Sequence, residues 1–174
     1  MVAYPECSPA DRAWLDGVRS TYDPEGHALL PPHFTLVFPT EGIAAAIVTR
    51  HTGAVAASML AFSFTLRYAI PVQDAVSGRW NAFLVPEEGH AAITLLHDAL
   101  YAGPLARHLR TGIPFVPHMT VAASDDGRTC ELLANRLRDD GIAVRGIVRF
   151  LSVASFDRSS VTTVATVPLK SLQV

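Results

Sequence analysis

The chain has 174 residues, of which 49% are hydrophobic and only 17% are charged. This length suits one domain that folds without metals or disulfides, and the composition excludes an intrinsically disordered chain. The formal net charge of −2, with no long basic run, argues against a protein that grips a long nucleic-acid backbone. We therefore expect a single domain over residues 1–174 that acts on a small or terminal substrate.

The first half of the chain alternates between helix and strand signals. A serine-proline pair predicts a helix over residues 9–20, and a loop is expected at residues 22–26. The aromatic and β-branched run 33–38, bounded by prolines, predicts a strand. The alanine-rich stretch from residue 41 to about residue 57 favours a helix.

The middle of the chain predicts a hairpin followed by a helix. Residues 62–68 alternate apolar with small or polar side chains, which is typical of a half-buried strand, and residues 80–85 are its expected partner across a glycine turn. The Pro-Glu-Glu sequence at residues 86–88 predicts the start of a helix that reaches residues 96–100 and resumes near Leu105.

The last third of the chain predicts one short strand, one helix and a closing hairpin. These elements are a strand at 118–122, a helix at 130–137 that starts near 124–126, and strands at about 144–154 and 161–169 around a polar turn at 157–160.

The two halves of the chain carry the same motif, 85 residues apart. The shift superposes Pro32 on Pro117, His33 on His118, Thr35 on Thr120, Leu36 on Val121, and Glu41-Gly42 on Asp126-Gly127. Because the match includes several positions at one offset, it predicts two pseudo-symmetric lobes, each with the same strand, turn and helix.

The spacing within the motif has a simple structural meaning. Residues i and i+2 of a strand point to the same side, so His33 lies beside Thr35 and His118 lies beside Thr120. The intervening Phe34 and Met119 should face the core. If the two lobes oppose these faces, a cleft forms with an imidazole and a hydroxyl from each wall.

Such a cleft suits the cleavage of a phosphate diester. One neutral imidazole can take a proton from the attacking oxygen while the other, protonated, gives a proton to the leaving oxygen. The hydroxyls of Thr35 and Thr120 can donate to the non-bridging phosphate oxygens. This chemistry needs no metal or other cofactor. The alternative interpretation is that both histidines are structural and are capped by their threonines.

The motifs Pro32-His33-Phe34-Thr35-Leu36-Val37-Phe38-Pro39 and Pro117-His118-Met119-Thr120-Val121 resemble those of the two-histidine phosphoesterases, particularly the bacterial 2'-5' RNA ligase-like branch. The resemblance covers essentially the whole chain. It implies a bilobal α+β fold, with two antiparallel-rich sheets flanked by helices around a central cleft. It also implies a metal-independent enzyme acting on 2',3'-cyclic phosphates or 2'-5' linkages of nucleotides or RNA ends.

The resemblance also suggests roles for the two histidines. In related cyclic phosphodiesterases, the second-motif histidine activates water and the first protonates the leaving oxygen, which gives a 2'-phosphate. By that analogy His118 is the base and His33 the acid, although the motifs themselves are too symmetric to assign the roles. The functions left open are a cyclic phosphodiesterase, a 2'-5' ligase for tRNA-like RNA, a non-catalytic nucleotide-binding module, and a phosphodiesterase for a non-RNA diester.

Other residues are candidates for substrate contacts. Phe38, Tyr68, Trp80 and Phe115 could stack on a base, although for any single one of them ordinary core is the favoured interpretation. Arg149 could supply a cation to the substrate, as could Arg67, Arg79 and Arg158. His90 and His97 are spaced for one helix face, which suits a metal, but we expect a solvated face there.

The remaining features indicate an ordinary cytoplasmic protein. Cys7 and Cys130 are too few and too far apart for a disulfide framework or a metal knuckle. No signal peptide or apolar run long enough to cross a bilayer is evident. We expect no membrane association and no obligatory protein partner, and a monomer whose binding partner is a nucleotide or RNA-end phosphodiester.

Overall fold

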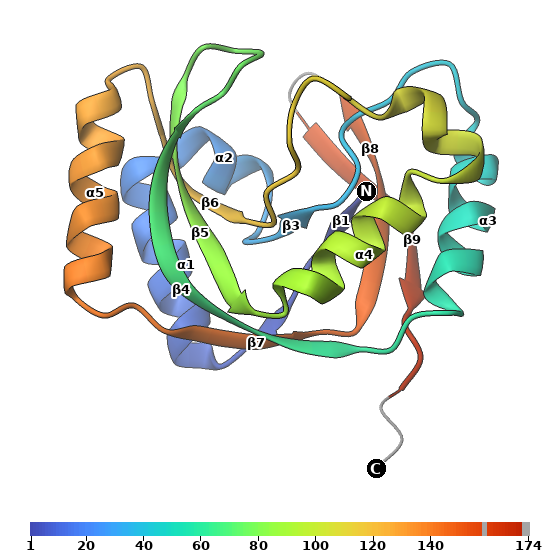
Figure 1. The fold of residues 1–174 in the computed structure, drawn as a ribbon, viewed down its shortest axis with the longest axis horizontal. Helices are drawn as coiled ribbons and strands as arrows, with labels where there is room; N and C mark the ends of the chain where they lie inside the picture. Colours follow the sequence, from blue (N-terminus) through green and yellow to red (C-terminus); the bar gives the residue numbers. More distant parts are fainter. Residues whose placement is uncertain (158–159, 172–174) are drawn as a thin grey trace.

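The computed structural model describes residues 1–157 and 160–171 and has an α+β fold built on two antiparallel sheets (Figure 1). The strand order is β3-β1-β8-β9 in the four-stranded sheet and β2-β7-β4-β5-β6 in the five-stranded sheet. Helices flank both sheets, so the predicted fold class is confirmed. The elements are β1 (Val2–Ala3), β2 (Glu6–Cys7), α1 (Pro9–Tyr22), α2 (Pro24–Leu29), β3 (Phe34–Thr35), α3 (Ala45–Ala56), β4 (Phe62–Gln73), β5 (Trp80–Glu88), α4 (His90–Leu100), the 3₁₀ helix η1 (Gly103–His108), β6 (Met119–Ser124), α5 (Gly127–Asp139), β7 (Val144–Val148), β8 (Phe150–Asp157) and β9 (Ser160–Pro168).

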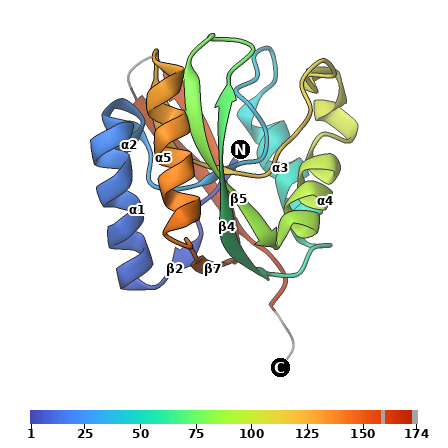
Figure 2. The same cartoon turned by 60° about the vertical axis from the view of Figure 1, so that its left-hand side comes forward.

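The five-stranded sheet is covered on one face by helices. Helix α5 packs on β4 and β5, α1 packs on β6, and the two helices lie side by side (Figure 2). The face beneath them carries Ala69, Leu84 and Met119, which are fully buried. These three residues are cross-strand neighbours, because Ala69 pairs with Leu84 and Leu84 with Met119. The opposite face of the same strands is therefore free to carry polar and aromatic side chains.

The four-stranded sheet is organised around β1. Val2 pairs with Thr35 on one side and with Ser152 on the other, so β1 lies between β3 and β8. Helix α3 packs against β8 and β9. The rings of Phe34 on β3 and Phe64 on β4 meet edge-to-face, with centroids 5.1 Å apart, and both are fully buried. The core therefore joins the two sheets directly.

Residues 24–29 form helix α2, whereas a loop was predicted at residues 22–26. Asp23 caps this helix, since its Oδ1 accepts from the Gly26 backbone N–H at 3.1 Å, and Pro24 occupies the first helical position. An aspartate followed by proline is a helix start as well as a turn signal. The predicted loop therefore missed a short helix.

The helix predicted to begin at residues 86–88 begins later, at His90. Pro86 to Glu88 are the end of β5, where Pro86 pairs with Leu66 at an irregularity in the ladder. A proline is tolerated at such a point, because the missing N–H leaves no ladder bond broken. Gly89, at φ +85°, makes the turn into α4, and a Cβ there would lie 2.8 Å from the Ser63 carbonyl oxygen.

The predicted strand 144–154 is two strands in different sheets. Strand β7 ends at Val148 and pairs with β2 and β4, whereas β8 begins at Phe150 and pairs with β1 and β9. Nothing in the local sequence marks Arg149 as the change of sheet, since it is neither glycine nor proline. Of the predicted polar turn 157–160, Arg158 and Ser159 lie outside the described residues.

Candidate functional site

The first motif lies at the edge of the four-stranded sheet. His33 immediately precedes β3, Thr35 is in the strand, and both are half-buried. Phe34 between them is fully buried, as the period of two predicts. The regular strand is shorter than the predicted 33–38, because Leu36 and Val37 both direct their N–H groups to the Met1 carbonyl.

The second motif repeats this arrangement in the other sheet. His118 immediately precedes β6, Thr120 is in the strand opposite Phe83, and Met119 between them is fully buried. The motifs therefore lie in different sheets, and both strands are near the middle of the molecule in Figure 1. The pseudo-symmetry of the two halves stays a prediction. Its helix starts are not equivalent, since Asp126 caps α5 whereas α3 begins three residues after Gly42.

The two imidazoles are held in the same way. Nδ1 of His33 lies 2.8 Å from the Pro31 carbonyl oxygen, and Nδ1 of His118 lies 2.6 Å from the Val116 carbonyl oxygen. A carbonyl can only accept, so each Nδ1 carries a hydrogen and donates it. In the neutral rings Nε2 is then the unprotonated nitrogen. Each histidine thus has Nε2 as the atom that gains or loses a proton.

Burial lowers the pKa of both histidines. For His33 it lowers the pKa to about 4, against the raising effect of the hydrogen bond to Pro31 and with further lowering by the charges of Arg19 and His118. For His118 burial also lowers the pKa, opposed by the hydrogen bond to Val116. Because the charge of His118 acts on His33, the two rings share one electrostatic environment. A bound phosphate would favour the protonated form of either ring.

Aromatic rings support both imidazoles. The ring of Phe83 on β5 stacks on His118 with centroids 3.5 Å apart and planes 14° from parallel. The ring of Tyr4 meets His33 edge-on, with centroids 6.2 Å apart. Neither aromatic residue was among the predicted site residues. The alternation of β5, which places Phe83 on the face opposite buried Leu84, is the sequence signal that could have identified the first of them.

A cavity of about 460 Å³ adjoins the first motif and is lined by both His33 and Thr35. Most of its wall is apolar and comes from the loop after β3, α3, η1, β8 and β9. Among its described lining residues, the titratable side chains are those of His33 and Glu41. Apolar lining residues include Phe38, Ile43, Val48, Leu105, Phe156 and Val164.

Two of the predicted stacking residues lie toward this site. Phe38 lines the cavity, and the guanidinium carbon of Arg110 lies 4.5 Å above the centre of its ring. Tyr68 on β4 pairs with Val85, two residues along β5 from Phe83, and so shares the face that carries Phe83 and Thr120. Its side chain is 49% exposed and its hydroxyl donates to Glu87 at 3.2 Å.

Trp80 and Phe115 pack against other side chains of the protein. Trp80 is on the same face of β5 as buried Leu84, and a Cβ on Gly127 would meet its indole at 2.7 Å. Phe115 stacks on His97, with centroids 3.7 Å apart. The expectation of a solvated face at His97 was wrong, because the residue is only 5% exposed and its Nδ1 lies 3.0 Å from Asp98.

The predicted arginines form ion pairs at the surface. Arg149 pairs with Glu6 at 3.1 Å. Arg67 pairs with Glu87 at 2.9 Å, and Arg79 pairs with both Glu25 and Asp125. Arg158 lies outside the described residues.

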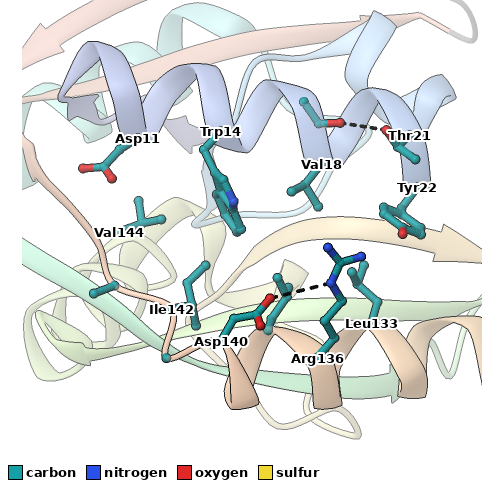
Figure 3. Close-up of a pocket in the computed structure, with 14 residues that line it drawn as sticks. Asp11, Trp14, Val18, Thr21, Tyr22, Leu133, Arg136, Asp140, Ile142 and Val144 are labelled. Carbon is teal, nitrogen blue, oxygen red and sulfur yellow. Dashed lines mark hydrogen bonds and ion pairs between the residues drawn. The ribbon is translucent and has the colours of Figure 1, made fainter.

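A second cavity, of about 620 Å³, lies between α1 and α5 (Figure 3). Trp14, Val18 and Tyr22 of α1 face Leu133 and Ile142 across it. It contains none of the predicted site residues. Over residues 1–157 and 160–171, no three histidine, cysteine or acidic side chains gather closely enough to hold a metal ion. In the same part of the chain no helix has the length and apolar character needed to span a bilayer.

Comparison with known proteins agrees with this fold. Residues 5–160 match the family model of the 2'-5' RNA ligase superfamily. Solved structures with a similar fold include E. coli LigT complexed with 3'-AMP, at 18% identity over 97% of both chains and a TM-score of 0.60. E. coli LigT in apo form is 18% identical over 97% of this chain and 96% of that one, with a TM-score of 0.53. A structure described as a phosphoesterase is 19% identical over 97% and 98% of the two chains, with a TM-score of 0.54.

The fold and the family match together define a protein of the phosphoesterase type. The chain belongs to the 2'-5' RNA ligase superfamily, as its two Pro-His-x-Thr motifs predicted. No protein of curated function is significantly similar in sequence.

Proposed function

We propose that the protein is a metal-independent phosphodiesterase that hydrolyses the 2',3'-cyclic phosphate of a nucleotide or an RNA end to a 2'-phosphate. The observation that carries this proposal is the matched pair of imidazoles. Each donates from Nδ1 to a carbonyl two residues upstream, each presents Nε2, and each is followed by a strand threonine.

The proposed reaction is an in-line exchange at phosphorus. Nε2 of His118, as the base, removes a proton from water as its oxygen bonds to phosphorus. The bond from phosphorus to the 3'-oxygen breaks, and Nε2 of protonated His33 gives its proton to that oxygen. Thr35 and Thr120 donate hydrogen bonds to the non-bridging oxygens as charge builds up on them. The products are a 3'-hydroxyl and a 2'-phosphate, and no redox change or cofactor is involved.

The lowered pKa values of the two histidines support an anionic substrate. Burial disfavours the protonated rings in the free protein, whereas a phosphate between them favours protonation. The proton that the acid needs is therefore held most readily when the anionic substrate is present. The apolar wall of the cavity beside His33 suits the uncharged base of a nucleotide.

Ligation is the alternative favoured by the family description. In that direction a ribose hydroxyl replaces water, and the same two histidines form a 2'-5' linkage in an RNA such as tRNA. A non-catalytic nucleotide-binding module is a further alternative, and the 3'-AMP in the E. coli LigT complex gives it a precedent for binding only.

The test is incubation with the four 2',3'-cyclic nucleotides in EDTA, with phosphorus NMR of the products. Formation of a 2'-phosphate supports the proposed function. Accumulation of a 2'-5' linked product from RNA fragments, with cyclic nucleotides left intact, would favour ligation. Tight binding of nucleoside monophosphates without turnover of any diester would favour the binding module.

A further inference from the structure

Arg19 of α1 is almost completely buried, with 2% of its surface exposed. Its Nη1 donates to the Leu30 carbonyl at 2.7 Å and its Nη2 donates to the Gly26 carbonyl at 2.8 Å. Leu30 directly precedes Pro31, the residue whose carbonyl accepts from Nδ1 of His33. One guanidinium thus holds the backbone of the segment that leads into the first motif.

Burying the charged side chain of Arg19 has a cost in folding free energy. Its Nε is buried and has no hydrogen-bond partner among the described residues. Burial lowers its pKa, opposed by the charges of Asp23 and Asp16 and reinforced by that of Arg12. An apolar side chain of similar volume is often at least as stabilising as a buried charge of this kind. The role of Arg19 is therefore argued from its two carbonyl contacts and its charge, and not from the volume it fills.

We propose that Arg19 is a positioning residue for His33, which it acts on through the Leu30 carbonyl and through its positive charge. This inference rests on the proposed function, in which His33 transfers a proton. By fixing Leu30, Arg19 fixes Pro31 and hence the acceptor that orients the imidazole. A ring displaced by about 1 Å can lose a large part of its catalytic effect.

The charge of Arg19 also acts on His33 directly. It contributes to lowering the pKa of that imidazole, and the charges of His118 and of the Met1 amino group act in the same direction. The carboxylate of Asp23 lies close to Arg19 and is itself influenced by Arg79 and Glu25. For His118 the causes of the lowered pKa are burial and, in the opposite direction, the hydrogen bond to Val116.

Two substitutions separate the roles of charge and geometry. Arg19→Lys keeps the charge but loses the planar fork that reaches two carbonyls, and Arg19→Met loses both. Arg12→Met is the matched control, because Arg12 is on the same helix but is only half-buried and pairs with Asp16 instead of with backbone carbonyls. The readouts are histidine NMR titration, with the His33 signal assigned by its absence in His33→Ala, and the pH dependence of kcat on a cyclic nucleotide.

In Arg19→Met we expect the His33 titration and one limb of the pH profile to move to higher pH, with kcat lowered about tenfold or more. In Arg19→Lys the titration stays near that of the unsubstituted protein while kcat still falls. Movement of the alkaline limb agrees with His33 as the acid, and movement of the acidic limb supports the positioning role with His33 as the base.

Equal behaviour of Arg19→Met, Arg19→Lys and Arg12→Met in both readouts would overturn the proposal. If Arg19→Met does not fold, the kcat of Arg19→Lys alone tests the proposal. If Arg19 is purely structural, a folded Arg19→Lys protein has an unchanged kcat, and that result would overturn the positioning role. If the unsubstituted protein cleaves no cyclic nucleotide, the proposed function fails, whereas the NMR titration still tests the coupling of Arg19 to His33.

Discussion

The imidazole of His118 lies nearly parallel to the phenyl ring of Phe83, with ring centroids 3.5 Å apart. The hydrogen bond to Val116 fixes one edge of the imidazole, and the Phe83 ring covers one face. These two contacts together determine where Nε2 points. Phe83 thus supports the second motif, although it is distant from that motif in sequence.

Phe83→Leu should lower kcat about tenfold, because the shorter side chain leaves the imidazole free to tilt. We expect KM to change much less, since Phe83 supports His118 without a role in binding of its own. Steady-state kinetics on a cyclic nucleotide measures both constants. Phe150→Leu, on the other sheet, is the control and should behave as the unsubstituted protein; an equal kcat in both variants would contradict the role of Phe83.

Replacing either motif threonine by valine should lower kcat by about 10²-fold, because each hydroxyl donates to an oxygen whose charge grows in the transition state. Valine keeps the shape of Thr35 or Thr120 and removes the donor. Serine keeps the donor, so Thr35→Ser and Thr120→Ser should retain most of the activity. Valine and serine variants of equal activity would show that the hydroxyls do not act in this way.

The stability of the protein should fall as the pH is lowered from about 7 toward 4. His33 has a pKa of about 4 in the folded chain, against an ordinary value of 6.5, so the unfolded chain binds more protons between these values. The free energy of unfolding then decreases as the pH falls through that window. Urea unfolding at several pH values measures it. His33→Gln, which cannot titrate there, should make the dependence shallower and leave the part that His118 contributes, whereas exposed His90→Gln should leave it as it is.

Tyr68 and Trp80 should respond differently to truncation. Loss of a stacked ring costs about 1–3 kcal/mol, so Tyr68→Ala should weaken nucleotide binding about 5-fold to 150-fold while Tyr68→Phe leaves it nearly unchanged. Trp80→Ala should lower the melting temperature instead, because the indole packs against α5. Calorimetry with a 2'-nucleoside monophosphate, together with thermal unfolding, compares them. If only Trp80→Ala weakened binding, Trp80 and not Tyr68 would be the residue that stacks on the base.

Local patterns in the sequence were enough to predict the motif geometry. The period of two placed Phe34 and Met119 in the core and left His33, Thr35, His118 and Thr120 on the other side, as the structure has them. This succeeds because side-chain alternation is a property of the strand itself. The two-sheet α+β architecture was implied by the family resemblance.

Features that depend on packing between distant segments were not predicted. The helix signal at residues 86–88 was overridden by pairing of Pro86 with Leu66, and the change of sheet at Arg149 has no local mark. The contacts of Arg19 with Leu30 and of Phe83 with His118 join separate elements. Such relationships come from tertiary structure, which local spacing does not encode.

The most direct test of the paired-histidine site is turnover of 2',3'-cyclic nucleotides in EDTA by the unsubstituted protein and by His33→Ala, His118→Ala and His90→Ala. General acid-base catalysis contributes about 10²- to 10⁴-fold, so each motif variant should lose activity on that scale while exposed His90→Ala retains it. The account predicts a 2'-phosphate product and a loss in both motif variants. Turnover that persists unchanged in either motif variant would contradict it.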